Sequence, residues 1–540
     1  MRVSSAVLAL SLASSSWAGI TVQKPFLSVP KKYASRRDDA KKLFTVSYDA
    51  YKQYAFGHDD LSPVSKGFND GRNGWGASIV DAMPTMYIMG LHSEFVEAVN
   101  FSSQIDFSAS KTSDKVSIFE TTIRYLGGFL SAYELSNYKY PALLKKAKEV
   151  ADKMAFGWVG DHPIPYGFLD FATNTPQIGT SNIAEAGTLS LEWRTLTKYT
   201  RNATYDKLAS GSVKHIANLP APLPGLAAQG IDPTTGNFVG GYVSWGGASD
   251  SYFEYLVKYA RLTNTKDHIY IDTWKTAVDS SIRTLLKKST VGDHTYLADY
   301  DSDGKIRHVG SHLACFHAGN WLLGGKLVQN QTIIKTALEL NDACWNTYTS
   351  TVTGIGPEAF AFESSDGNFT GGGTPSAAQQ AFYDQHGFYI TSSAYILRPE
   401  VLESNFHAWR VTGDTKYLDR AASAIDSFNK WLPSTVAFAA LNDVNSANGG
   451  FIDDMQSFWF AEVLKYLYLT FDDPRHISLD DYVFNTEAQP FRAPPALPSY
   501  TGSGGWLPHK PFKVQTGPAL PAVSPNPFIV SGVPTGTNDQ

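Results

Sequence analysis

The feature of this sequence that most constrains its fold is a recurring pair of amphipathic segments joined by a short polar turn. In each copy the first segment ends near an aromatic residue, the turn contains Asn, Gly or Asp, and a Tyr opens the second segment. The apolar residues follow the three- and four-residue spacing that one face of a helix requires. The turn residues tolerate non-helical backbone. Copies of this motif span residues 129–144, 191–208, 252–274 and 406–421.

Serial helical hairpins restrict the architectures open to the chain. A hairpin that cannot bury its apolar face alone must stack on its neighbours. The hairpins are separated by long Gly-rich loops such as 218–248 and 350–388, which favours a closed ring of helices over an open solenoid. An irregular helical protein is the alternative. Loops gathered at one end of a ring would carry the functional site. Further helices are predicted at 38–55, 78–99, 319–349 and 457–470.

The composition fits a globular protein with a neutral ligand. Of the 540 residues, 43% are hydrophobic and 18% are charged, and the net charge is −6. The apolar share excludes global disorder, and the negative net charge argues against a nucleic-acid partner. The charge-poor chain contains 12 Trp, 28 Tyr and 31 Phe, a balance that suits a carbohydrate or another neutral polar ligand.

The N-terminus is typical of a secretory signal peptide. Arg2 precedes the apolar run 6–12, and Ser16-Trp17-Ala18 forms a small-x-small cleavage site. The run is shorter than the roughly 20 apolar residues that span a bilayer, and no later apolar stretch reaches that length. The sequence therefore predicts a protein with no membrane span that is secreted or resides in the secretory-pathway lumen.

Two further features agree with the secretory route. The two cysteines, Cys315 and Cys344, are predicted to form one disulfide in an oxidising compartment, with two buried free thiols as the alternative. Four N-x-Ser/Thr sequons predict N-glycosylation. Their asparagines are Asn100, Asn202, Asn330 and Asn368.

We divide the chain into four parts. After the signal peptide (1–18) comes an N-terminal segment (19–37) and then a helical barrel (38–491) that would carry the functional site. The final part, 492–540, is Pro-rich, so helices are not expected there and an extended, partly disordered tail is predicted.

Several acidic residues lie in segments that otherwise look like core. Buried acids are costly unless they are paired, hydrogen-bonded or bound to a cation. Each one alone is explained by a structural ion pair, as Glu120 and Arg124 at i, i+4 would form. Together, at the starts of successive helices of one ring, they could converge on an acidic cavity. The acids are Glu120, Glu185, Asp250, Glu254, Glu358, Glu400, Glu403, Glu462 and Glu487.

An acidic cavity supports two chemistries. Two carboxyl groups can hydrolyse a glycoside as acid and base, and oxygen ligands can bind a hard cation such as calcium. The motifs of a nucleophilic-serine hydrolase, a P-loop and a zinc protease do not occur. His312 and His317 are five residues apart and do not share a helical face, so no zinc pair is expected.

Five segments carry a family resemblance. They resemble glycoside hydrolase family 47, the class I α-1,2-mannosidases that trim N-glycans, and are most similar to its secreted filamentous-fungal members. The resemblance runs from about residue 40 to 490. It implies an all-α fold, an (α/α)7 barrel closed at one end by a small C-terminal β-hairpin that includes residues 483–486. The two cysteines look like the single disulfide of the family. The matching segments are 54–65, 119–128, 250–256, 398–404 and 484–488.

The resemblance also implies roles for individual residues. Hydrolysis is expected to invert the anomeric centre, with Glu120 as general acid and Glu400 as general base. Asp250 is the rival for one of these roles, and Glu358 belongs to the same ring of carboxyls. Thr486 is expected to bind Ca²⁺ through its carbonyl and hydroxyl oxygens, with waters at most other positions. Arg398 is expected to hold Glu400 and Asp250 in their charged forms. Substrate-binding roles are implied for Arg124, Glu185, Arg398, Glu403, Phe458, Glu462 and Glu487.

The implied substrates are high-mannose N-glycans, on glycoproteins or as free oligosaccharides, trimmed from Man9GlcNAc2 towards Man5GlcNAc2 by a monomeric enzyme. The small Ala248, two residues before Asp250, predicts trimming of several α-1,2-linked mannoses. Two alternatives remain. One is a lectin-like quality-control factor that binds glycans on the same barrel. The other is a different helical-ring glycosidase, such as a glucan-acting enzyme, which would need neither Thr486 nor calcium.

Overall fold

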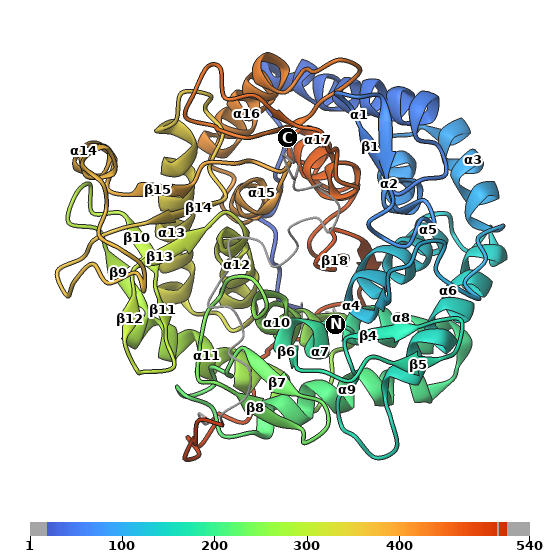
Figure 1. Ribbon diagram of the computed structural model, residues 1–540, viewed down its shortest axis with the longest axis horizontal. Coiled ribbons are helices and arrows are strands. Elements are labelled where there is room, and N and C mark those ends of the chain that lie inside the picture. Colours follow the sequence, from blue (N-terminus) through green and yellow to red (C-terminus); the bar gives the residue numbers. More distant parts are fainter. Residues whose placement is uncertain (1–18, 505–506, 516–540) are drawn as a thin grey trace, which may run out of the picture.

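Two concentric rings of helices form the body of the protein (Figure 1). The structure is a computed structural model that describes residues 19–504 and 507–515; the predicted signal peptide and the end of the Pro-rich tail lie outside the described residues. The inner helices are α2 (Ala77–Ile88), α5 (Gly127–Leu135), α8 (Ser190–Thr200), α10 (Asp250–Thr263), α12 (Phe316–Leu327), α15 (Glu400–Thr412) and α17 (Leu464–Phe471). The outer helices are α3 (His92–Ser102), α6 (Pro141–Met154), α9 (Ala203–Asn218), α11 (Ile269–Thr284), α13 (Gln331–Thr349), α16 (Lys416–Trp431) and α1 (Ala34–Tyr54).

Each inner helix packs against one outer helix, which makes seven pairs within the described part of the chain. The first and last helices close the ring, because α1 packs on α17 and α2 packs on the π-helical turn η5 (Trp459–Val463) that precedes α17. Inner helices touch neighbours on several sides, so α10 and α15 are buried along almost their whole length. Outer helices such as α16 bury only one face and are amphipathic. The predicted (α/α)7 barrel is confirmed.

Two predicted helices are in fact hairpins. The segment 78–99 is interrupted at Gly90, whose φ of 71° ends α2 before α3 begins. The segment 319–349 breaks after Leu327, and the Asn330 side chain caps α13 by accepting hydrogen bonds from the N–H groups of Thr332 and Ile333. Apolar periodicity continues across both turns, which is why periodicity alone did not reveal the breaks. A further helix, α14 (Ala377–His386), lies outside the ring in a segment predicted to be a loop.

The β-strands are short and antiparallel, and they lie in the connections between helices. The strands are β1 (Asp60–Ser62), β2 (Gly67–Asn69), β3 (Val116–Ser117), β4 (Phe168–Asp170), β5 (Thr175–Pro176), β6 (Ser181–Asn182), β7 (Gly230–Asp232), β8 (Asn237–Val239), β9 (Leu286–Lys288), β10 (Thr295–Leu297), β11 (Asp299–Tyr300), β12 (Ile306–Arg307), β13 (Val309–Ser311), β14 (Ala359–Ala361), β15 (Tyr389–Ser392), β16 (Ala440–Leu441), β17 (Phe451–Ile452), β18 (Tyr482–Phe484) and β19 (Pro490–Arg492). The remaining helical turns are η1 (Lys31–Tyr33), α4 (Ile118–Thr121), η2 (Thr122–Leu126), η3 (Ala155–Gly157), α7 (Ile183–Gly187) and η4 (Leu313–Cys315).

The hairpin of β18 and β19 enters the ring and presents its turn at the centre (Figure 1). Asn485 organises that turn. Its Oδ1 accepts hydrogen bonds from the N–H groups of Glu487 and Gln489, and its Nδ2 donates to the Ile123 carbonyl at 3.0 Å. A Cβ at Gly127 would lie only 2.8 Å from that Nδ2, so glycine permits the close approach. The turn is thereby joined to the start of the second hairpin of the ring.

The chain ends pack on the barrel where they are described. The N–H group of Val22 donates to Asp480 at 2.6 Å, and the buried Arg410 donates to the Leu469 carbonyl at 2.8 Å and to Gln23 at 2.8 Å. After β19 the described part of the tail has no helix or strand. It is held along α10 and α11 by contacts such as that of Ser503 with Asp272.

Three features bear on the predicted secretory route. Cys315 and Cys344 are joined by a disulfide, which confirms the prediction and excludes the free-thiol alternative. Within residues 19–504 and 507–515, no helix is both long and apolar enough to cross a membrane. All four sequon asparagines are exposed, at positions Asn100, Asn202, Asn330 and Asn368.

Candidate active site

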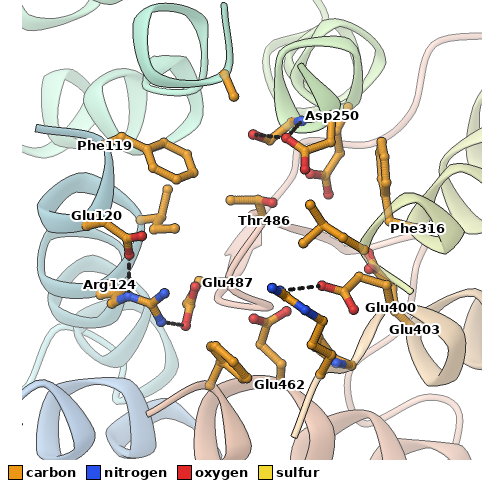
Figure 2. Close-up of a pocket in the computed structure, with 18 of the residues that line it drawn as sticks. Phe119, Glu120, Arg124, Asp250, Phe316, Glu400, Glu403, Glu462, Thr486 and Glu487 are labelled. Atoms are coloured by element: carbon orange, nitrogen blue, oxygen red, sulfur yellow. Dashed lines mark hydrogen bonds and ion pairs between the residues drawn. The ribbon is translucent and has the colours of Figure 1, made fainter. Parts of the chain in front are cut away.

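The starts of several inner hairpins converge on one central cavity, which has the β18–β19 turn as its floor (Figure 2). Glu120 lies in α4, and Asp250 and Glu400 are the first residues of α10 and α15. A carboxylate at a helix start is favoured by the unpaired backbone N–H groups there. Figure 2 shows Thr486 at the centre, between Glu120 on one wall and Asp250 and Glu400 on the other. The space between these walls, including solvent at the open mouth, is about 810 Å³.

The Glu120 wall is rich in arginine. Arg124 Nε donates to Glu120 Oε2 at 2.7 Å, and Arg72 Nε lies 3.4 Å from the same oxygen. Burial raises the pKa of Glu120, but the positive charges of Arg124 and Arg72 outweigh that effect and hold the pKa below its ordinary value. Arg124 also pairs with Glu487 and Asp81, from within the π-helical turn η2. Such turns interrupt α-helices most often at functional sites.

The Glu400 wall contains a chain of hydrogen bonds. His312 Nδ1 lies 2.7 Å from Glu400 Oε2, and His312 Nε2 lies 2.7 Å from the Tyr348 hydroxyl. Arg398 Nη1 is 3.6 Å from Glu400 Oε1, while Arg398 Nε donates to Glu358 at 2.7 Å. Burial raises the pKa of Glu400, but the bond from His312 and the charge of Arg398 outweigh it, so the pKa lies below its ordinary value. Glu400 is therefore ionised near neutral pH.

Asp250 differs from both glutamates. Burial, together with the negative charges of Glu254 and Glu400, raises the pKa of Asp250 to about 7. Its carboxyl accepts a hydrogen bond from the Ser251 N–H at 2.8 Å. The expected pairing with Arg398 is not found among the described residues, because that guanidinium is directed to Glu358 and Glu400. A carboxyl with a pKa near 7 can exchange a proton near neutrality, as an acid–base catalyst requires.

The centre of the cavity is crowded with carboxyl groups that disfavour one another's ionised forms. Burial and neighbouring carboxylates raise the pKa of Glu403 and Glu462 well above the ordinary value, and burial does the same for Glu487 despite Arg124. Thr486 presents its hydroxyl among them. In the described ranges, no three His, Cys, Asp or Glu side chains are arranged to hold a metal directly. The oxygens of Thr486 and of the surrounding carboxyl groups are the donor atoms that a hard cation prefers.

Comparison with known proteins identifies the family. Residues 43–493 match the model of glycosyl hydrolase family 47. This chain belongs to glycosyl hydrolase family 47. It is 39% identical to the probable mannosyl-oligosaccharide alpha-1,2-mannosidase 1B of Aspergillus clavatus over 91% of this chain and 99% of that one. It is also 39% identical to the mannosyl-oligosaccharide alpha-1,2-mannosidase 1B of Aspergillus phoenicis, over 91% and 98% of the two chains.

A solved structure supports the same assignment. The alpha-1,2-mannosidase from Trichoderma reesei superposes with a TM-score of 0.82 at 36% identity, covering 85% of this chain and 99% of that one. This family 47 chain is therefore a glycoside hydrolase, and its acidic central cavity is the candidate active site.

Most of the predicted site residues of this family 47 hydrolase meet in the cavity. Glu185 and Glu358 do not line it: Glu185 accepts a hydrogen bond from Ser181 at 2.7 Å, and Glu358 lies behind Arg398. Glu358 also follows a loop and precedes strand β14, and so is not at a helix start. The residues that line the cavity as predicted are Glu120, Arg124, Asp250, Arg398, Glu400, Glu403, Phe458, Glu462, Thr486 and Glu487.

The sequence reasoning missed several contributors. Phe119 lies within a motif that carried the resemblance, so its position next to the predicted Glu120 was the available signal. Arg72 and Phe316 line the cavity from segments that contain no recognisable pattern. His312 was considered only as a zinc ligand, whereas it contacts Glu400 from 88 residues away in the sequence.

Proposed function

We propose that this family 47 hydrolase is a calcium-dependent α-1,2-mannosidase that removes terminal α-1,2-linked mannose from high-mannose N-glycans with inversion. The named relatives support the linkage and the sugar. The observation that carries the chemistry is the unequal protonation of the carboxyls around one cavity. Glu400 is held ionised by His312 and Arg398, whereas the pKa of Asp250 is raised to about 7. Separate acid and base groups are what glycoside hydrolysis needs.

In this proposal Glu400 is the general base and activates the attacking water. Glu120 is the general acid by resemblance and would act through a water, although Arg124 and Arg72 lower its pKa and so disfavour its protonated form. Asp250 is the rival acid, and its pKa of about 7 specifically favours that second assignment. The phenyl ring of Phe458 offers an apolar face to the C–H face of a mannose ring. Arg124, Glu403, Glu462 and Glu487 supply hydrogen-bonding groups for sugar hydroxyls and water.

Thr486 would hold calcium through its carbonyl and hydroxyl oxygens. When bound, calcium supplies a hard Lewis-acidic centre that can hold sugar hydroxyls and orient water. Its charge would also offset the negative charge of Glu403, Glu462 and Glu487. The chain's own residues orient the sugar and hold the protons. A route through the secretory pathway, ending in secretion or lumenal residence, is part of the proposal, and so is a monomeric enzyme.

The test is digestion of a labelled high-mannose N-glycan, followed by proton NMR, with EDTA and with calcium added back. Release of β-mannose that stops in EDTA and returns with calcium is the expected result. α-Mannose as the first product would contradict inversion. Glycan binding without mannose release would favour a lectin-like protein instead.

A second comparison separates the two candidate acids. α-Mannosyl fluoride has a leaving group that needs no proton, so a variant lacking the general acid should retain activity on it. Glu120→Gln and Asp250→Asn are therefore compared on the fluoride and on α-1,2-mannobiose. The acid is the residue whose variant loses activity on mannobiose but keeps it on the fluoride.

A further inference from the structure

A second cavity, which we call the outer cavity, lies beside the central one and shares no lining residue with it. It lies between the β13–β14–β15 sheet and the segment that precedes α10, on the side of the ring where these strands gather (Figure 1). Its space, including solvent at the open mouth, is about 870 Å³. Its defining residues are Tyr242, Asp299, Arg307, His317, Phe360 and Thr391. None of them has a part in the proposed reaction.

The two cavities are separated by a thin wall. Leu313 and Phe316 line the central cavity, whereas Ala314 and His317, in the same segment, line the outer cavity. The loop before α10 is divided in the same way, because Ala248 lines the central cavity and Gly246 the outer one. A branched ligand with one end in the central cavity therefore has a second pocket close by.

Two charged groups in the outer cavity are held in place by the protein. Asp299 is only 6% exposed, and its Oδ2 accepts a hydrogen bond from the Tyr242 hydroxyl at 2.7 Å. Arg307 Nε donates to the Thr370 carbonyl at 2.6 Å, and its guanidinium lies 5.5 Å from the centre of the Tyr242 ring. No hydrogen bond to the two Nη groups of Arg307 occurs among the described residues. Donors that are already oriented and lack protein acceptors are suited to a ligand.

His317 has the clearest unmet hydrogen-bonding capacity in this cavity. It is 5% exposed, and its Nδ1 has no partner in the part of the chain that the structure describes. Burial lowers the pKa of His317 to about 3, so the ring is neutral and carries one donor and one acceptor. A buried polar atom without a partner is costly, and such atoms in native proteins call for an explanation.

We propose that the outer cavity binds a further mannose unit, beyond the terminal disaccharide that occupies the central cavity, of the same branched oligosaccharide. This inference rests on the proposed function. The carboxylate of Asp299, the guanidinium of Arg307 and the imidazole of His317 match vicinal sugar hydroxyls, which both donate and accept. The rings of Tyr242 and Phe360 offer apolar faces for the C–H side of a pyranose. The opposite charges of Asp299 and Arg307 balance, which favours a neutral ligand over an anion.

The test compares a short and a long substrate. α-1,2-Mannobiose fills only the central cavity, whereas a nine-mannose N-glycan can reach both cavities. Thr391→Trp places a bulky ring at the exposed edge of the outer cavity, and Arg307→Gln removes the guanidinium but keeps a donor for the Thr370 carbonyl. Thr175→Trp, an equally exposed strand position that lines neither cavity, is the matched control.

We expect each outer-cavity variant to raise KM for the glycan about 5–20-fold, because each loses the hydrogen bonds that one sugar unit would make in the outer cavity. The kcat for the glycan and both constants for mannobiose should stay within about twofold of the parent, as in the control. Unchanged KM for the glycan would show a cavity that holds only water, and equal losses on both substrates would show a structural role; either overturns the inference. If the unaltered enzyme cleaves neither the glycan nor mannobiose, the proposed function itself fails, and that outcome is distinct from both.

Discussion

Replacement of His312 should move the acidic limb of the pH–rate profile to higher pH. The imidazole is fully buried, and its Nδ1 lies 2.7 Å from Glu400 Oε2. A general base works only when it is ionised, so activity falls as the pH drops through the pKa of Glu400. Because His312 is a cause of the lowered pKa of Glu400, removal of the ring raises that pKa, and the limb shifts upward.

The size of the shift follows from the hydrogen bond. A bond to a charged group contributes about 1.5–3 kcal/mol, and one pKa unit corresponds to about 1.4 kcal/mol. His312→Leu should therefore shift the acidic limb of kcat/KM on α-1,2-mannobiose upward by about 1–2 pH units. His312→Asn, whose amide can donate from near the position of Nδ1, should recover most of the shift.

The control is the far end of the same hydrogen-bond chain. Tyr348→Phe removes the bond to His312 Nε2 but leaves the bond to Glu400 intact. Tyr348→Phe leaves His312 Nε2 without this partner, and His312→Leu leaves both Glu400 Oε2 and the Tyr348 hydroxyl without theirs, so each variant should lose at least about 1–3 kcal/mol of stability. Only His312→Leu should move the pH profile. An equal loss of activity at every pH in folded His312→Leu, or the same shift in Tyr348→Phe, would refute the reasoning.

Four further predictions concern the general acid, calcium, the disulfide and helix packing. Glu120→Gln should lower kcat on mannobiose about 10²–10⁴-fold while calorimetry still detects glycan binding, and full activity would remove Glu120 from the acid role. Chelation should abolish activity and lower the thermal midpoint, since a ligand at about 100 times its Kd adds about 2.7 kcal/mol; an unchanged midpoint with full activity would contradict a calcium site. The double variant Cys315→Ala, Cys344→Ala removes the disulfide, whose cysteines are 29 residues apart in the sequence. Its free energy of unfolding, measured with denaturant, should fall by about 3–4 kcal/mol while kcat stays unchanged. Gly324→Ala, whose Cβ would overlap the Trp274 ring, should cost about 1–3 kcal/mol by the same assay, and wild-type stability would show that the helices separate easily.

Local patterns in the sequence were sufficient wherever the deciding interaction is short in range. The i, i+4 spacing of Glu120 and Arg124 predicted a contact that the structure has at 2.7 Å. The hairpin motifs at 129–144 and 406–421 correspond to α5–α6 and α15–α16. In both cases the geometry of one helix, or of one turn, decides the result. The same reasoning failed at Gly90, because the apolar pattern runs through the turn without a change of period.

Contacts between distant segments could not be obtained in this way. His312 reaches Glu400 across 88 residues, and Arg124 reaches Glu487 across 363. The sequence analysis expected Arg398 to act on Glu400 and Asp250. In the structure its guanidinium pairs with Glu358 and Glu400. The outer cavity has no sequence signature, because its wall is built from strands and loops that are separate in the chain.

The sequence by itself therefore determined the helical hairpins, the disulfide and the family-specific acids, since these depend on local periodicity, on having only two cysteines, and on motifs that are contiguous in the chain. Only the tertiary structure decided which carboxyls are ionised and which are protonated. A pKa is set by burial and by charges that lie within a few ångströms in space, and ring closure is what brings those charges from separate hairpins to one cavity.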